Sequence, residues 1–440
     1  MRLQARIGWL LLGGWSLLAM AEPVPLQPLI DRTPPGETLR LEAKVYAGPV
    51  VITRPIVLDG QGQATIDAGG KGSVIVLKTD GATIRNLHLT GSGESHNDID
   101  AGIQVRGKYN VIRDNRIDDC LFGIDLQQSN NNVVRRNRIR SKPFELGQRG
   151  DAIRLWYSFD NRIEENDIRD ARDTVVWYSA NNVIARNTAR NSRYSLHFMY
   201  SRFNLVEDNE YVNNTVGIFL MYSDGVVVRN NYIANAAGPT GVGIGFKETS
   251  DLTVEGNQIL YCSSGMYLDV SPFQPDTTNR LRGNLIAYNA IGVRFLNDWT
   301  GNIFHGNSFV DNLTQVAVTG GQTANRNEWD GNYWSDYEGF DRDGDGVGDT
   351  PYVLYDYADR LWQDEPYAQF FKGSPMLEVL DYLARLAPFS QPRLLVQDDH
   401  PRLAPITEPA LPAAVESEGA SETETGGADA LELLRKSLGR

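Results

Sequence analysis

The stretch NVIRDNRI, residues 110–117, recurs along the chain as NVVRRNRI from Asn132, NRIEENDI from Asn161, NVIARNTA from Asn182, NLVEDNEY from Asn204, NRLRGNLI from Asn279 and NIFHGNSF from Asn302. The trailing Asn of this pattern falls at residues 86, 115, 137, 166, 187, 209, 230, 257, 284, 307 and 332, at intervals of 21 to 29 residues. A period in the twenties with short apolar runs indicates a solenoid, in which each repeat buries its apolar face against its neighbours.

The short apolar runs favour strands over helices. In NVIRDNRI, Val111 and Arg113 point to one side of a strand, while Ile112 and Asp114 point to the other. A leucine-rich repeat would also fit the period, but its LxxLxL spacing is missing. We therefore predict an all-β fold, a right-handed parallel β-helix of about eleven regular coils, with equivalent Asn amides stacked inside it as a ladder.

The flanking segments differ from the repeat in composition. Arg2 and Arg6, an apolar run and Ala19-Met20-Ala21 predict a cleaved signal peptide and hence an exported protein. The C-terminal region is Pro-, Ala- and Glu-rich and ends in a short amphipathic stretch. The predicted segments are 1–21 signal peptide, 22–80 N-terminal cap and first coils, 81–335 parallel β-helix, 336–372 Asp-rich closing segment, 373–390 helix, 391–428 disordered acidic tether and 429–440 short C-terminal helix.

Charge and cysteine content narrow the function classes. Without Arg2 and Arg6 the chain holds 40 basic and 56 acidic residues, a net charge of −16, which argues against nucleic acid as a partner. No segment after the signal peptide is apolar enough to predict a transmembrane helix. Cys120 and Cys262 each lie five residues after a ladder Asn but six coils apart, so we expect two buried free thiols.

Four successive strands end in related tetrapeptides, LWYS (155–158), VWYS (176–179), FMYS (198–201) and LMYS (220–223). The spacing is one coil, so Trp156, Trp177, Met199 and Met221 form one column on the outer face, with His197 two residues from Met199 on the same face. Thioether sulfur and imidazole nitrogen suit Cu(I). The alternative is ordinary packing under a covering loop, because methionine often fills gaps.

An Asp-rich loop follows the last coil. Asp341, Asp343, Asp345 and Asp349 match the oxygen-ligand positions of a calcium loop, although Tyr352 stands where a bidentate Glu is usual. We predict a weak structural calcium site that closes the end of the solenoid. An acidic turn without metal is the alternative.

Parallel β-helices often belong to polysaccharide lyases, hydrolases and epimerases. Outward charges such as Asp125 with Arg154, or Asp269 with Arg294, do not form a convergent carboxylate set with His or Lys, and the Asp-Pro-His-Asp signature of uronan epimerases is absent. We therefore predict no enzyme activity. The alternative is a periplasmic carbohydrate-binding or polysaccharide-modifying protein, in which Trp156 and Trp177 stack on sugar rings.

The Asn repeats, the strands LHFMYS and FLMYS, and the closing segment GNYWSDYEGFDRDGDGVGDTPY (331–352) resemble the NosD family over nearly the whole mature chain. The resemblance implies a non-enzymatic periplasmic protein that docks on the membrane subunit of an ABC transporter. It also implies copper handling, with a copper chaperone and nitrous oxide reductase as partners in assembly of the copper–sulfur centre of the reductase.

Under that resemblance, His197, Met199 and Met221 become the candidate ligands for transient Cu(I), with Trp156 and Trp177 shielding one side of the site. The predicted helix over 374–387, with Met376, Leu380 and Leu383 on its apolar side, becomes a candidate transporter contact. A docking surface for the reductase or a chaperone, built on the same aromatic column, remains the second reading of the patch.

Overall fold

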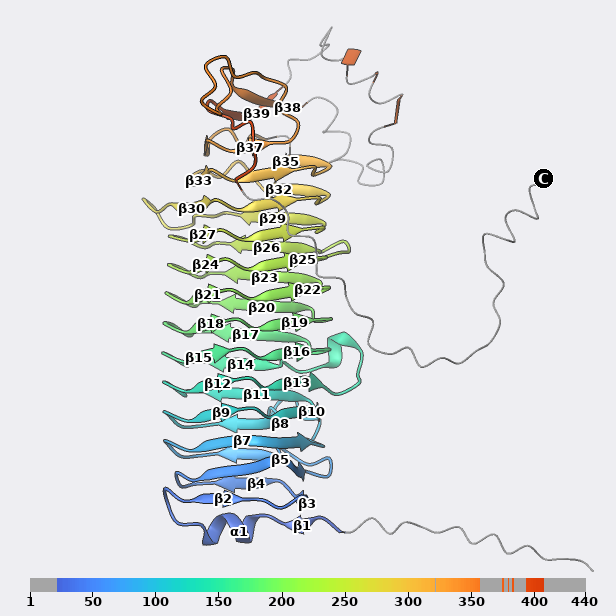
Figure 1. The fold of residues 1–440 in the computed structure, drawn as a ribbon, viewed down its shortest axis with the longest axis vertical. Coiled ribbons are helices and arrows are strands. Elements are labelled where there is room, and N and C mark those ends of the chain that lie inside the picture. Colours follow the sequence, from blue (N-terminus) through green and yellow to red (C-terminus); the bar gives the residue numbers. More distant parts are fainter. Residues whose placement is uncertain are drawn as a thin grey trace, which may run out of the picture. The chain divides into compact units, whose positions relative to one another are not determined.

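The computed structural model describes residues 22–320, 322–356, 374–375, 379, 382–383 and 393–406. Within these residues the chain winds into a stack of parallel β-coils, as predicted (Figure 1). The predicted signal peptide and the predicted C-terminal helix at 429–440 lie outside the described residues. No helix among the described residues is long and apolar enough to cross a membrane.

Each coil contributes one strand to a 12-stranded parallel sheet. Its strands are β4 (Val50–Ile52), β6 (Ile75–Leu77), β8 (Ala101–Val105), β11 (Phe122–Gln127), β14 (Ile153–Trp156), β17 (Asp173–Trp177), β20 (Tyr194–Met199), β23 (Val216–Met221), β26 (Val242–Lys247), β29 (Ser264–Asp269), β32 (Ile291–Phe295) and β35 (Thr314–Val318).

The other two sides of the coils form one 25-stranded sheet, because the long strands β5 (Val57–Asp67) and β7 (Thr83–Thr90) run through both sides. One side holds β2 (Thr38–Arg40), β9 (Val111–Arg113), β12 (Val133–Arg135), β15 (Arg162–Glu164), β18 (Val183–Ala185), β21 (Leu205–Glu207), β24 (Val227–Arg229), β27 (Thr253–Glu255), β30 (Asn279–Arg282), β33 (Asn302–His305) and β36 (Glu328–Asp330). The other holds β1 (Val24–Pro25), β3 (Val45–Ala47), β10 (Arg116–Cys120), β13 (Arg138–Ser141), β16 (Asp167–Arg169), β19 (Thr188–Arg190), β22 (Glu210–Val212), β25 (Tyr232–Ala234), β28 (Gln258–Leu260), β31 (Leu285–Ala287), β34 (Ser308–Val310) and β37 (Tyr333–Trp334).

A continuous ladder of buried Asn side chains runs through the coils. Each Nδ2 donates to the Oδ1 of the ladder Asn in the next coil at 2.9–3.0 Å, through Asn115, Asn137, Asn166, Asn187, Asn209, Asn231, Asn257, Asn284, Asn307 and Asn332. The Asn187 amide also donates to Ile163 O and accepts from the N–H of Asn166. Every polar atom of the amide is therefore paired away from water.

Two predicted ladder positions were wrong by one residue. Asn86 and Asn230 lie just before the ladder, at φ 54°, and the ladder positions in their coils belong to Leu87 and Asn231. The preceding position takes a left-handed backbone in coil after coil, which Asn tolerates well, so adjacent asparagines fit either place. A second buried Asn ladder, through Asn110, Asn132, Asn161, Asn182 and Asn204, had not been recognised.

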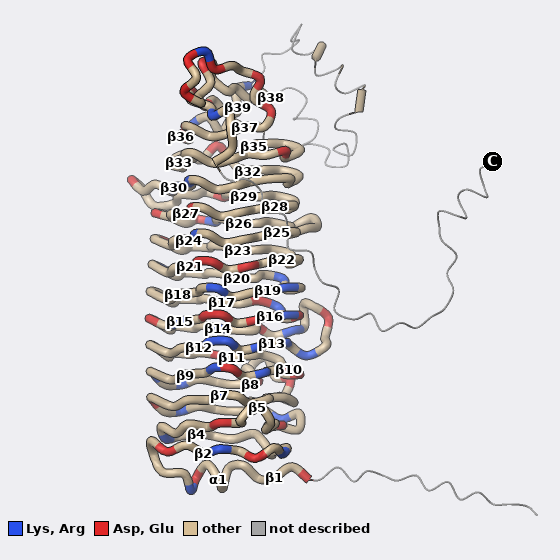
Figure 2. Tube along the Cα trace, in the orientation of Figure 1, with Lys and Arg blue, Asp and Glu red and all other residues tan. Residues whose placement is uncertain are grey.

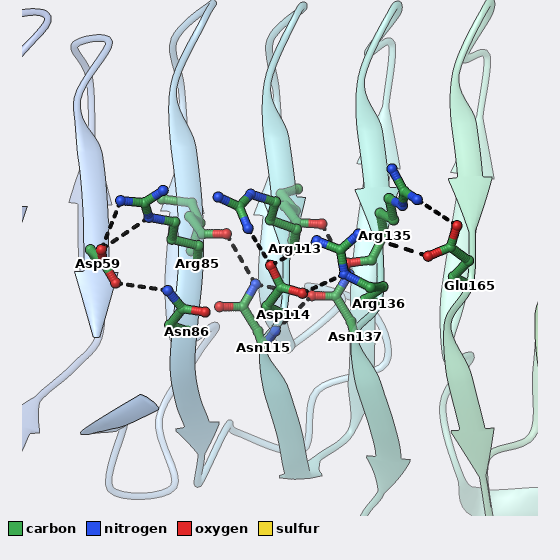
Figure 3. A network of polar contacts seen from close by, with 12 residues as sticks. Asp59, Arg85, Asn86, Arg113, Asp114, Asn115, Arg135, Arg136, Asn137 and Glu165 are labelled. Atoms are coloured by element: carbon green, nitrogen blue, oxygen red, sulfur yellow. Dashed lines mark hydrogen bonds and ion pairs between the residues drawn. The ribbon is translucent and has the colours of Figure 1, made fainter. Parts of the chain in front are cut away.

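Ion pairs accompany the ladder on the outside of the first coils (Figure 3). Asp114, at a left-handed position, accepts from Arg136 of the next coil at 2.7 Å. Arg135 then reaches Glu165 at 2.6 Å. Figure 2 shows the same mixing of red and blue along the central coils, so neighbouring coils meet through opposite charges although the chain as a whole is acidic.

The N-terminal end of the solenoid is covered by α1 (Gln27–Arg32), which buries Ile30. This cap and the first coils lie within the predicted 22–80 segment. The buried thiols of Cys120 and Cys262 are unpaired, as predicted. Burial raises the pKa of each to about 12, so neither forms a thiolate near neutral pH.

The C-terminal end is closed by an antiparallel pair, β38 (Tyr352–Asp356) and β39 (Arg393–Asp398). Buried Asp398 ends the ladder: its Oδ2 accepts from Asn332 Nδ2 at 2.9 Å, from Asn332 N at 3.0 Å and from Trp334 Nε1 at 3.1 Å. The prediction that the tether begins at 391 was therefore wrong for residues 393–406. Leu395 and Val396 are buried there, and a carboxylate supplies the acceptor that the last Asn needs.

We predict that Asp398→Asn lowers the free energy of unfolding by about 2–3 kcal/mol, because an amide replaces a charged acceptor of several buried N–H donors. Urea unfolding followed by far-ultraviolet circular dichroism measures the change. The exposed neighbour Asp399 provides the control, and Asp399→Asn should change stability by less than about 0.5 kcal/mol. Equal effects of the two substitutions would contradict the role given to Asp398.

Candidate metal site on the outer face of the 12-stranded sheet

Strands β14, β17, β20 and β23 place the predicted column in register. Trp156 pairs with Trp177, Trp177 with Met199 and Met199 with Met221. All four side chains are half-buried on the outer face of the sheet, while the alternating residues Leu155, Val176, Phe198 and Leu220 fill the core. The column forms because one coil of chain separates its members, so each side chain lies about 4.8 Å from the next along the solenoid.

His197 lies on the same outer face, in register between Val175 and Phe219. Only 7% of the residue is exposed. Its ring stacks on Tyr194 at 4.7 Å between centroids and meets the Trp177 ring edge-on at 6.0 Å. The sequence placed His197 on the outer face of the sheet; the larger aromatic side chains on that face cover its imidazole.

The His197 Nε2 atom lies 3.1 Å from the Sδ atom of Met221. Burial lowers the pKa of His197 to about 4, with attraction from Asp173 opposing the shift, so the imidazole is neutral at neutral pH. A thioether sulfur only accepts hydrogen bonds, so Nε2 carries the proton in this contact. Nδ1 is buried and has no partner among the described residues.

The donor set fits a soft metal ion. Typical metal–nitrogen and metal–sulfur bonds of about 2.0 and 2.3 Å allow one ion to touch two atoms that are 3.1 Å apart. Met199, on the same strand as His197, offers a second thioether in register with Met221. Coordination of a metal through Nε2 requires the Nε2 proton to move to Nδ1, which carries no proton in the neutral ring. The structure thus brings His197 and Met221 together, with Met199 beside them.

The two tryptophans have different surroundings. Trp177 touches His197, and its Nε1 is buried without a hydrogen-bond partner among the described residues. Trp156 lies one coil further away, 5.6 Å from Trp177 between ring centroids, with Arg154 over its ring at 4.8 Å. Of the two tryptophans, Trp177 is the one in position to shield His197.

A charged cluster beside His197 was missed at the level of sequence. Arg172 reaches Asp151 at 2.8 Å, and Arg193 reaches Asp173 at 3.0 Å; both carboxylates are buried. Burial raises the pKa of Asp151 to about 6. The signal was an acid at or just before the start of two adjacent strands, in GDAIRLW and RDTVVW, each followed one coil later by an Arg.

The Asp-rich loop brings three of its four predicted ligands together. Carboxylate oxygens of Asp341, Asp343 and Asp345 all lie within 4.8 Å of one another. Asp349 does not join that cluster; its Oδ2 accepts from the N–H of Arg342 at 2.7 Å. Backbone N–H groups of Gly346 and Gly344 lower the pKa of Asp341, so this carboxylate stays charged at neutral pH.

The outward charge pairs differ in part from those considered in the sequence. The fully buried carboxylate of Asp125 contacts two partly exposed arginines, Arg154 at 3.2 Å and Arg106 at 2.8 Å. Asp269 contacts Lys247 at 2.6 Å rather than Arg294. Of the predicted helical contact residues, Leu383 is exposed, and Met376 and Leu380 lie outside the described residues.

Residues 135–339 match a protein family described as "Periplasmic copper-binding protein (NosD)". A "Probable ABC transporter binding protein NosD" from Pseudomonas aeruginosa is 32% identical over 87% of this chain and 91% of its own length. The chain belongs to the NosD family. A protein of the same description from Stutzerimonas stutzeri is 29% identical over 91% of this chain and 94% of its own length.

Solved structures share the fold of this NosD family member at low identity. The A-module of an Azotobacter vinelandii mannuronan C-5 epimerase, AlgE6, superposes with a TM-score of 0.52 at 16% identity, covering 67% of this chain and 90% of the module. The catalytic domain of a GH87 α-1,3-glucanase gives a TM-score of 0.53 at 14% identity, covering 66% of this chain and 64% of that one. These likenesses confirm the parallel solenoid.

His197 provides a pH-dependent test of the site's burial. Between pH 6.5 and about 4 this imidazole is protonated in the unfolded chain but stays neutral in the native protein. Stability therefore falls as pH falls through that window. In His197→Gln, which cannot titrate, we expect the loss of unfolding free energy from pH 7 to pH 4.5 to shrink by about 2 kcal/mol. Urea unfolding at both pH values measures it, and an unchanged loss would mean that His197 titrates like an exposed imidazole.

Proposed function

We propose that this chain is a non-enzymatic periplasmic copper-binding subunit that works with the membrane part of an ABC transporter. In this role it accepts Cu(I) from a chaperone and helps to supply the copper–sulfur centre of nitrous oxide reductase. Membership of a family described as periplasmic and copper-binding, with relatives named for an ABC transporter, supports the proposal.

The contact between His197 Nε2 and Met221 Sδ at 3.1 Å is the observation that carries the proposal. Two thioethers and one imidazole form a soft ligand set that favours Cu(I) over harder ions. The low pKa of His197 keeps protons from competing with the metal under mildly acidic conditions. All three side chains reach the outer face of the sheet, from which an ion can be passed on.

We predict that Met199→Leu/Met221→Leu weakens Cu(I) binding by at least about tenfold, or roughly 1.4 kcal/mol, because sulfur is lost while volume is kept. Titration of Cu(I) against a competing chelator measures the affinity. Met266→Leu is the matched control, since Met266 is fully buried in the core and should leave the affinity unchanged.

Maturation of the reductase in cells distinguishes two hypotheses for the column of Trp177, Met199 and Met221: a copper relay and a docking surface. Loss of copper affinity together with loss of maturation supports a copper relay. Equal affinities of wild type and the double variant would place copper elsewhere. Unchanged affinity with failed maturation would make the column around Trp177 and Met199 a docking surface for the reductase or the chaperone.

A carbohydrate-binding or polysaccharide-modifying activity is the competing class. Tyr157, Tyr178, Tyr200 and Tyr222 stack face to face at 4.8–5.1 Å between centroids, and Tyr178 also meets Trp156 in a T-shaped contact at 5.3 Å. Aromatic faces already used in this way are poorly placed to stack on sugar rings. A screen for activity on uronan and neutral polysaccharides distinguishes this class from a copper-binding protein. Saturable turnover of any of these polysaccharides would overturn the copper proposal.

We further propose that Asp341, Asp343 and Asp345 bind calcium weakly and stabilise the closing loop. Millimolar calcium should raise the melting temperature, because a ligand that binds only the native state stabilises it. Asp341→Asn should abolish the rise. Asp349→Asn serves as the comparison, since Asp349 bonds to the backbone of Arg342 and should leave the rise in place. An unshifted wild-type melting temperature would indicate a turn without metal.

A further inference from the structure

Arg294 is exceptional among the charged side chains on the outer face of the 12-stranded sheet. Its neighbours on this face each have an opposite charge in contact: Asp125 with Arg106 and Arg154, Asp151 with Arg172, Asp173 with Arg193, and Lys247 with Asp269. Among the described residues, Arg294 has neither an ion pair nor a hydrogen bond, and its Nε atom is buried without a partner.

The surroundings of Arg294 are apolar or uncharged. Its cross-strand neighbours are Tyr267 on β29 and Ala317 on β35. The residues two positions away along the chain are Gly292 on β32 and Leu296 just beyond its end. Burial lowers the pKa of Arg294, although a guanidinium stays charged at any physiological pH. The guanidinium of Arg294 is therefore a permanent, half-buried positive charge, and none of the described residues neutralises it.

The carboxylate of Asp269 on the neighbouring strand already has a partner. Asp269 lies two residues beyond Tyr267, the cross-strand partner of Arg294, but its Oδ2 contacts the Lys247 Nζ at 2.6 Å. A cation that loses water without gaining an anion destabilises the native state. That cost disappears when a ligand brings the missing negative charge, and a guanidinium binds carboxylate and phosphate oxygens through two parallel N–H bonds.

We propose that Arg294 is the anchor of a second ligand site, which binds a small oxyanion on the outer face of β32. Its ligand class is a tetrahedral inorganic oxyanion or a small carboxylate, held by the guanidinium beside the ring of Tyr267. The site lies in the same column as His197, separated from it by Phe219, Gly245 and Tyr267, which is four coil steps or about 19 Å. The proposal does not depend on copper binding.

The test compares melting temperatures in a chloride buffer free of oxyanions with those after adding phosphate or acetate at matched ionic strength. Phosphate and acetate distinguish a tetrahedral anion from a carboxylate, and matched chloride removes general screening. We expect one of them to raise the wild-type melting temperature by about 1–3 °C when its concentration exceeds the dissociation constant about tenfold. Calorimetric titration of the same anion should show one saturable site.

Arg294→Met should give two linked results. Without oxyanion its melting temperature should equal or exceed that of wild type, because an unpaired charge has been removed, and the anion-induced rise should vanish. Arg294→Lys keeps the charge but not the two parallel N–H bonds, and should show a weaker rise. Arg190→Met is the matched control: Arg190 lies on β19 on another side of the solenoid and pairs with Glu210, so the rise should persist.

Two outcomes would overturn the site. One is a wild-type protein that neither phosphate nor acetate stabilises or titrates. The other is an anion-induced rise of equal size in wild type and Arg294→Met, which would show that the anion binds elsewhere. Circular dichroism of each variant verifies that the β-solenoid is intact, so that loss of the rise reports the ligand site rather than folding.

Discussion

The structure depends on the hydrogen bonds between buried Asn amides of successive coils. An amide enclosed in a protein interior is costly unless both its N–H groups and its oxygen find partners. Here each amide finds them only when the next coil stands directly above at the strand spacing. The ladder therefore specifies coil register in a way that the interchangeable Ile, Leu and Val side chains of the core cannot, because apolar contacts are not directional.

Fixed register is what allows functional side chains to be assembled from separate coils. His197 and Met199 come from β20 and Met221 from β23, two strands that are separate in the sequence, and they lie side by side because one coil of chain returns to the same place on the sheet. The outer face can carry such groups without cost to the core, since alternating residues point inward. The same geometry gives Asp125 two arginines from the coils on either side.

The period of the Asn pattern was sufficient to predict the solenoid, the separation of the cysteines and the Trp–Trp–Met–Met column, because all three depend only on coil length. The exact ladder position at Asn230 and Asn231 was not predictable, since Asn suits both the ladder and the left-handed residue before it. Asp398 was missed because it lies outside the repeat, 66 residues after its partner Asn332. The burial of His197 depends on how Tyr194 and Trp177 orient their rings, and the pairing of Asp269 depends on the reach of Lys247, neither of which spacing determines.

The ladder also has a direction. Every ladder Nδ2 donates one of its two hydrogens toward the C-terminal end, to the side-chain oxygen of the next ladder residue. The oxygen of the first Asn accepts from the backbone of Leu87, and the last amide meets a carboxylate, which can only accept. A whole coil can be inserted or deleted without disturbing this order, because any coil with an Asn at the ladder position both receives and donates. The residue that ends the ladder cannot be replaced by another Asn in that way, because it must accept hydrogen bonds without donating one. Over evolutionary time such a protein can lengthen or shorten in steps of about one coil, provided that the carboxylate of Asp398 is kept at the end of the ladder.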